Sequence, residues 1–281
     1  MEQIFLPTSV EFVGGETPNV GKLIITPCHQ GYGTTLGNAL RRVLLSSLPG
    51  AAVEAIKING AQHEFSTLEG VLEDVIEIIL NVKQIAVISH TDQPVAIMVK
   101  KSGVGSVLAA DFSKNSDIEI VNPDLVIANI TDKNITFEME LTIGRGRGYV
   151  PVADKETKQL TLGTIAIDSL YTPIRDVGYA VEMTRVGDVT DYEKLTMTIE
   201  TNGTVMPRSA VEQATKILMD HFALILGAGE GLQNTNEEGS VETMVQDEET
   251  AIEPTDASEE KSSPKKAKSA KNGGKKAKKT E

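Results

Sequence analysis

Apolar and polar residues alternate with a period of two in many short runs of this 281-residue chain. The clearest run is 135–143, in which Ile135, Phe137, Met139 and Leu141 would share one face of a strand. Such alternation indicates sheets with one buried face and one wet face. The pattern predicts strands at residues 22–26, 53–58, 85–88, 95–99, 135–143, 161–167, 180–185 and 194–201.

Two segments in the first third of the chain have the helical period of three to four residues instead. In residues 36–48, Thr34 or Thr35 can cap the start and the pair Pro49-Gly50 ends the helix. Residues 67–81 carry a near-ideal apolar stripe. A capping box of Ser66 and Glu69 is expected ahead of it, and the solvent face is expected to hold Glu73, Asp74 and Glu77.

A third helix is predicted from Pro207 to about Leu226, where the run Gly227-Ala228-Gly229 would end it. Its second half, residues 222–226, reads Phe-Ala-Leu-Ile-Leu and is apolar nearly all round. One sheet cannot cover such a helix on every side, so it needs a second burying surface. A partner subunit is the simplest candidate, and the feature therefore favours a dimer.

The residue types that carry chemistry are sparse. Cys28 is the only cysteine, and the four histidines share no metal-ligand spacing. Carboxylates pair only on predicted wet helix faces or in the tail, and no nucleophile elbow is present. We therefore expect no metal, no cofactor and no catalytic residue. The N-terminus lacks a secretory pattern and no apolar run approaches about 18 residues, so we expect a cytoplasmic protein without membrane contact.

Two glycine-rich motifs admit more than one interpretation. Gly31-Tyr-Gly-Thr-Thr-Leu-Gly37 follows a predicted strand and opens a helix, as a phosphate cradle does. Its spacing matches neither the dinucleotide motif nor the P-loop, which favours a tight turn with close helix packing. A phosphate-binding enzyme remains the alternative. Gly144-Arg-Gly-Arg-Gly148 could be an RGG-type nucleic-acid segment, but one copy at a strand end favours a surface turn with functional arginines.

The C-terminal charges are strongly partitioned. Residues 230–260 hold eleven acidic residues and no Lys or Arg, whereas 261–281 hold nine lysines, and residues 1–229 keep 18 basic and 28 acidic residues. We expect residues 230–281 to be disordered, since the tail has no aromatic residue and no sustained periodicity. Its lysines could contact nucleic-acid phosphates without sequence preference, or fold back on the acidic tract. A nucleic-acid-binding module is thus a further alternative, through Lys265, Lys266, Lys275 and Lys276.

Four stretches in order carry a family resemblance: PCHQGYGTTLGNALRRVLLSSLPG at 27–50, HEFSTLEG at 63–70, GRGYVP at 146–151 and ETNGT at 200–204. They are similar to bacterial RNA polymerase alpha subunits, and the resemblance spans residues 1–229. It implies an α+β protein in which residues 1–49 and 174–229 form a dimerisation domain with an antiparallel sheet and two long helices. Residues 50–173 would be an inserted α+β domain. No apolar periodicity follows Leu232, so the usual C-terminal DNA-binding domain is expected to be absent.

The resemblance implies an assembly role in transcription: a homodimer that docks the beta and beta-prime subunits of a nucleotidyltransferase, DNA-directed RNA polymerase, and reaches DNA through that complex. The implied dimer interface holds Leu36, Leu40, Leu44, Leu48, Leu218 and Phe222. The implied beta-docking surface holds Asn38, Arg41, Arg42 and Leu45, and the beta-prime surface holds Lys83, Tyr171 and Arg175. Gln30 and Thr34 stand where the family commonly has Arg and His, so charged contacts there are not expected.

Overall fold

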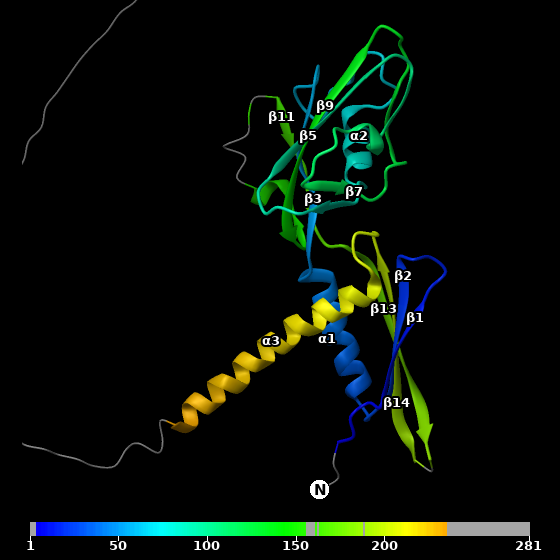
Figure 1. The fold of residues 1–281 in the computed structure, drawn as a ribbon, viewed down its shortest axis with the longest axis vertical. Coiled ribbons are helices and arrows are strands. Elements are labelled where there is room, and N and C mark those ends of the chain that lie inside the picture. Colours follow the sequence, from blue (N-terminus) through cyan, green and yellow to red (C-terminus); the bar gives the residue numbers. More distant parts are fainter. Residues whose placement is uncertain (1–3, 156–160, 162, 188, 235–281) are drawn as a thin grey trace, which may run out of the picture. The chain divides into compact units, whose positions relative to one another are not determined.

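Two larger antiparallel sheets, two short strand pairs and three α-helices make up most of the described chain, which is α+β as predicted (Figure 1). The computed structural model describes residues 4–155, 161, 163–187 and 189–234. Of the predicted disordered tail, residues 230–234 are the end of a helix, which corrects that boundary. Residues 235–281 lie outside the described residues, as do the four lysines named for nucleic-acid contact.

The first sheet pairs strands from the start of the chain with the two strands that precede the last helix. Its strand order is β1-β2-β14-β13, with every neighbouring pair antiparallel. Alternate residues such as Leu195, Met197 and Ile199 are fully buried, and the residues between them are half-buried, as the period of two requires. The strands are β1 (Ser9–Gly14), β2 (Val20–Cys28), β13 (Ile174–Val186) and β14 (Val189–Thr201).

Helix α1 (Tyr32–Ser46) packs on this sheet through its leucines and two small residues. A Cβ atom at Gly37 would lie 2.8 Å from the Tyr179 ring and 3.1 Å from Leu195, so only glycine permits this approach. The helix begins earlier than predicted. Its N-cap is Gly31, at φ 85°, which has no side chain with which to cap the helix, so the expected cap by Thr34 or Thr35 is wrong.

A buried carboxylate anchors the start of α1. Oε1 of Glu193, on β14, accepts the Gly31 N–H at 2.9 Å, and its Oε2 accepts the Gly33 N–H at 2.9 Å. The side chain is only 7% exposed, which makes these charge-assisted bonds strong. Two N–H groups that no helical carbonyl can satisfy are thereby paired, and the negative charge lies at the positive end of the helix dipole.

The second sheet has the order β5-β9-β3-β4-β7, with β11 also paired to β3. The predicted alternation over 135–143 is confirmed from Phe137 onward: Phe137, Met139, Leu141 and Ile143 are buried. Short pairs β6–β8 and β10–β12 flank it. The bounds are β3 (Pro49–Ile58), β4 (Val87–Ser89), β5 (Val95–Ser102), β6 (Gly105–Leu108), β7 (Ile118–Ile120), β8 (Val126–Ile130), β9 (Thr136–Arg147), β10 (Tyr149–Val150), β11 (Thr164–Ala166) and β12 (Ser169–Leu170). Two 3₁₀ turns, η1 (Ala109–Asp111) and η2 (Val152–Asp154), lie between strands.

The helix predicted over 67–81 is α2, and it spans only Val75–Val82. Gly70 has φ 72°, and the segment beside it is hydrogen-bonded to β8, where the Leu72 N–H donates to the Asn129 carbonyl. The predicted capping box is wrong, because Asp74 is the N-cap and accepts the Glu77 N–H at 2.8 Å. Glu73 is also not a solvated residue, since its carboxylate accepts the backbone and side-chain N–H groups of Asn129.

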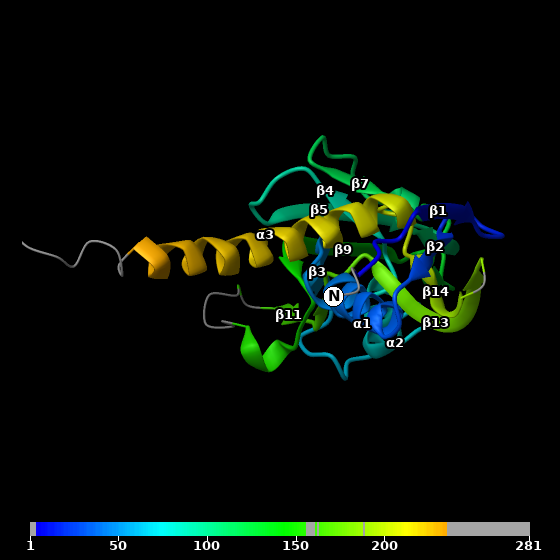
Figure 2. The same cartoon turned by 90° about the horizontal axis from the view of Figure 1, so that it is seen from below.

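Helix α3 (Pro207–Asn234) is longer than predicted and continues through Gly227 and Gly229. Its first half enters the core of the first sheet through Ala210, Val211 and Ala214. Figures 1 and 2 both show its second half extending away from α1 and that sheet. None of the helices in the described ranges combines the length and the hydropathy that a membrane span requires.

The buried apolar residues form two clusters. One lies between α1, the start of α3 and the first sheet, and the other lies between α2 and the second sheet. The chain passes between them where α1 leads into β3 and where Tyr171 leads into β13. At this passage a Cβ atom on Gly50 would overlap the backbone carbonyl oxygen of Tyr171.

We predict that Gly50→Ala lowers the free energy of unfolding by about 1–3 kcal/mol, because a backbone oxygen cannot move away as a flexible side chain can. The measurement is urea unfolding. Gly178→Ala is the matched control, since a Cβ there would meet no atom within 4 Å. Equal effects of the two changes would contradict the packing argument.

We also predict that Glu193→Gln costs about 1–3 kcal/mol, since an amide keeps only one acceptor for the two glycine N–H groups. Glu200→Gln, on the same strand, is the control: the Glu200 side chain has no hydrogen-bond partner among the described residues. Thermal unfolding of both variants checks this. A Glu193→Gln protein as stable as the Glu200→Gln protein would contradict the anchoring role.

Candidate functional site

The N-terminus of α1 is not open to a phosphate. The Glu193 carboxylate already occupies the N–H groups of Gly31 and Gly33 that such a cradle would use. A Cβ atom at Gly33 would lie 2.8 Å from Glu193 Oε2, so this glycine serves the close carboxylate contact. The geometry supports the tight-turn interpretation of the Gly31–Gly37 motif and gives the phosphate-binding alternative no site there.

Cys28 lies beside this anchor and is fully buried. Burial raises the pKa of its thiol, and the nearby charge of Glu193 raises it further. A thiol held in its neutral form and away from solvent is a poor nucleophile. Cys28 is therefore a packing residue of the first core.

The outward side of α1 carries the polar residues expected to dock the beta subunit. Asn38, Arg41 and Arg42 are exposed, and Leu45 is half-buried. Neither guanidinium has an ion pair or a side-chain hydrogen bond among the described residues. The structure thus brings the four residues onto the one side of α1 that the sheet leaves uncovered.

The residues expected at a dimer interface separate into two groups. Leu40, Leu44 and Leu48 are at most 6% exposed and fill the chain's own first core. They cannot present a face to a second copy in this conformation, so the expectation for these three needs correction. Leu36 and Leu218 are half-buried beside that core, and the Phe222 side chain is 58% exposed.

The exposed apolar surface on α3 is larger than Phe222 alone. Its other members in this part of the helix are Met219, Leu224, Ile225 and Leu226, all exposed. Met219 was not expected, although its spacing of three residues from Phe222 places it on the same side of the helix. We call these five residues the α3 apolar end.

The three residues expected to dock the beta-prime subunit do not form one exposed surface. The Lys83 ammonium pairs with the Asp168 carboxylate at 3.0 Å. The Val152 N–H at 2.9 Å and then Lys83 hold the pKa of Asp168 below its usual value. Tyr171 is buried, which corrects its assignment as a contact residue, whereas Arg175 is exposed.

Tyr171 belongs to a buried polar cluster that the sequence did not indicate. Its hydroxyl donates to Glu54 Oε1 at 2.6 Å. Burial first and then Glu54 raise the pKa of Tyr171 to about 12. The Lys155 ammonium donates to Ser169 Oγ at 2.6 Å and to the carbonyls of Glu54 and Ile167, and burial lowers the pKa of Lys155. The cluster ties the segment before β13 to β3.

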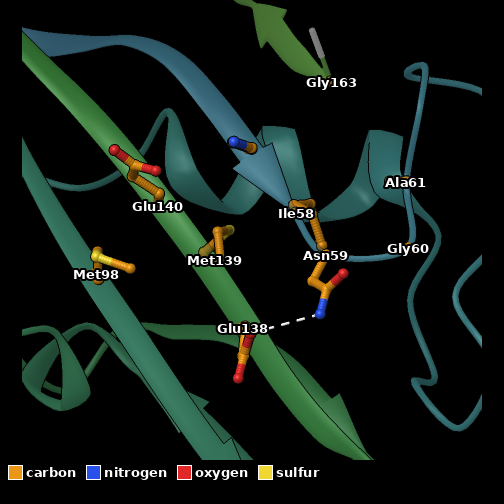
Figure 3. Close-up of a pocket in the computed structure, with 10 residues that line it drawn as sticks. Ile58, Asn59, Gly60, Ala61, Met98, Glu138, Met139, Glu140 and Gly163 are labelled. Carbon is orange, nitrogen blue, oxygen red and sulfur yellow. Dashed lines mark hydrogen bonds between the residues drawn. The ribbon is translucent and has the colours of Figure 1, made fainter. Parts of the chain in front are cut away.

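A surface hollow lies over the wet face of β9 (Figure 3). Figure 3 shows Asn59 turned toward Glu138, to which it donates a hydrogen bond of 3.4 Å. Lys100 pairs with the same carboxylate at 2.5 Å. The Glu138 carboxylate thus sits on an open sheet face with a salt-bridge partner, and no group of metal-ligating side chains gathers in the described part of the chain. We assign the hollow no chemistry.

Comparison with known proteins places the chain in a family. A family model described as the RNA polymerase Rpb3/RpoA insert domain matches residues 56–172. The DNA-directed RNA polymerase subunit alpha of Clostridium botulinum is 47% identical over 234 residues, which cover 83% of this chain and 72% of that protein. The subunit of the same name from Clostridium kluyveri matches to the same extent. The chain is therefore a member of the RNA polymerase alpha-subunit family.

Proposed function

We propose that two copies of this chain form a dimer and that the dimer is the platform on which the beta and beta-prime subunits assemble. The alpha-subunit family membership supports this proposal, and so do two exposed surfaces: the α3 apolar end and the arginine side of α1. Catalysis would belong to the two large subunits. The chain would work in the cytoplasm, at the nucleoid, as part of the polymerase.

The proposed division into two domains follows the two clusters of buried apolar residues. Residues 1–49 and 174–229 would form the dimerisation domain, and residues 50–173 the inserted domain. The match of residues 56–172 to an insert-domain model supports this division. So does the separation of the buried apolar residues into two clusters.

The dimer contact is proposed at the α3 apolar end. Five large apolar side chains exposed within two turns of a helix are costly to leave in water, and burying each contributes about 1.5–3 kcal/mol. Exposed apolar clusters of this kind mark interfaces. A second copy is the partner that supplies an identical surface, and two-fold symmetry closes such a contact without further growth. Leu36 and Leu218, half-buried beside the first core, would extend it.

The beta contact is proposed at Asn38, Arg41, Arg42 and Leu45. An unpaired guanidinium can form two parallel hydrogen bonds to a carboxylate, which fixes the orientation of the partner as well as binding it. The proposed beta-prime contact keeps Arg175 and Lys83 and omits Tyr171. On docking, the Lys83 ammonium would either leave Asp168 for a group of beta-prime or contact both. The Lys-rich end stays a prediction from charge alone, because it lies outside the described residues.

We predict that Phe222→Glu weakens self-association by at least about 30-fold, because the change buries a carboxylate in an apolar contact. Sedimentation velocity over a dilution series measures it. Met183→Glu is the control, since Met183 is similarly exposed but lies on β13. Dimers of unchanged affinity in the Phe222→Glu protein would contradict the proposed interface.

We predict that Arg42→Ala leaves the dimer intact but abolishes capture of the beta subunit in reconstitution, and that Arg42→Lys also impairs capture because Lys lacks the planar fork. Arg175→Ala, which removes another exposed arginine, should capture beta normally. Unimpaired capture by the Arg42→Ala dimer would count against docking through this side of α1.

A further inference from the structure

The Gly-Arg-Gly-Arg-Gly motif occupies residues 144–148. Its first four residues are the end of β9, and Gly148 lies in the bend that follows. A Cβ atom at Gly146 would lie 2.9 Å from the Tyr171 ring, and one at Gly144 would overlap the Glu54 carboxylate. Both glycines therefore face the buried Tyr171–Glu54 cluster. Since successive residues of a strand point to opposite faces, Arg145 and Arg147 lie on the other face.

The backbone fixes Arg147 next to the end of α1. Arg147 is paired with Pro49, which follows α1 by three residues. Gly148, at φ 63°, turns the chain, and its carbonyl accepts the Tyr171 N–H at 2.8 Å. A Cβ atom on Gly148 would lie 3.4 Å from the carbonyl oxygen of Ser46, the last residue of α1. The bend after β9 thus abuts the last turn of α1.

Arg42 lies one helical turn before Ser46, and its backbone carbonyl accepts the Ser46 hydroxyl at 2.8 Å. The inserted domain and the docking helix therefore each place an arginine at the same junction. Both guanidiniums are free of polar partners in the described ranges, and both residues are exposed.

The neighbouring arginine differs in this respect. Arg145 shares the strand and the face of Arg147, but its guanidinium donates to Asp92 at 2.9 Å. Among the described arginines, those without a polar partner are Arg41, Arg42, Arg147 and Arg175, and those with one are Arg145, Arg185 and Arg208.

We propose that Arg147 extends the α1 docking surface onto the inserted domain and binds a carboxylate of the same large subunit that Arg42 engages. This inference rests on the proposed docking function of α1. The fitting partner is a protein surface with carboxylates spaced to meet two arginines from different elements. Contact with both cores at once would make docking depend on their correct relative packing, so a misfolded inserted domain would be rejected.

The test is capture of the beta subunit by full-length dimers that carry Arg147→Ala, with Arg145→Ala as the matched control. Loss of a charge-assisted hydrogen bond at the contact should weaken capture about tenfold or more. Arg145→Ala should change it by less than about threefold, since that guanidinium is already committed to Asp92. Unchanged unfolding midpoints and dimer affinities show that each variant is folded.

Arg42→Ala, measured in parallel, separates the two levels of the proposal. If Arg42→Ala abolishes capture and Arg147→Ala leaves it unchanged, the extension to Arg147 is wrong and the docking function stands. If both dimers capture beta normally, the docking function itself fails. Equal losses of beta capture in the Arg145→Ala and Arg147→Ala proteins would show that only the net charge of the surface matters, and they would also overturn the inference. A smaller salt dependence of capture for Arg147→Ala alone supports it.

Discussion

The contact between the Glu193 carboxylate and the start of α1 determines much of what this chain presents to its surroundings. It satisfies the N–H groups of Gly31 and Gly33 inside a buried site, and it ties the start of α1 to β14. With Gly37 packed against Tyr179, the helix lies flat on its sheet. Leu40 and Leu44 are consequently buried, and the side of α1 that carries Arg41 and Arg42 is consequently exposed.

Glycine plays the same part in the second core. Gly50, Gly144 and Gly146 make room for Tyr171 and Glu54, and the arginines of the motif are turned to the opposite face. In both places a close internal contact decides which charged side chains remain available. An assembly subunit benefits from such rigidity, because a docking arginine is useful only where its guanidinium is held in a defined position. The α3 apolar end differs, since its side chains are exposed in the described part of the chain, and a second copy is proposed to cover them.

Much of this could be predicted from the sequence. The period of two located most of the longer strands, and the leucine spacing located α1. The local sequence pattern was less informative where tertiary contacts determine the conformation of a segment. Residues 67–74 have helical periodicity, but Gly70 and the bonds to β8 hold them in another conformation. Leu40 and Leu44 were correctly identified as apolar helix residues, but spacing does not reveal whether a sheet of the same chain or a second copy covers them.

Long-range polar contacts were beyond the reach of sequence reasoning. Gly31 and Glu193 are 162 positions apart, and Tyr171 and Glu54 are 117 apart. A carboxylate that caps a distant helix looks like any other strand carboxylate until the strands are placed. The short strands β6, β7 and β12 were missed for a related reason: two to four residues do not establish a period.

The most direct test of the central claim, that the exposed side of α1 docks a large subunit, is site-specific photo-crosslinking. A photoreactive amino acid placed at Asn38 in the assembled polymerase should crosslink to the beta subunit, while one at Glu200, on the first sheet, should not. If the photoreactive group at position 38 reacts only with water or with the same chain, docking through this side of α1 is contradicted.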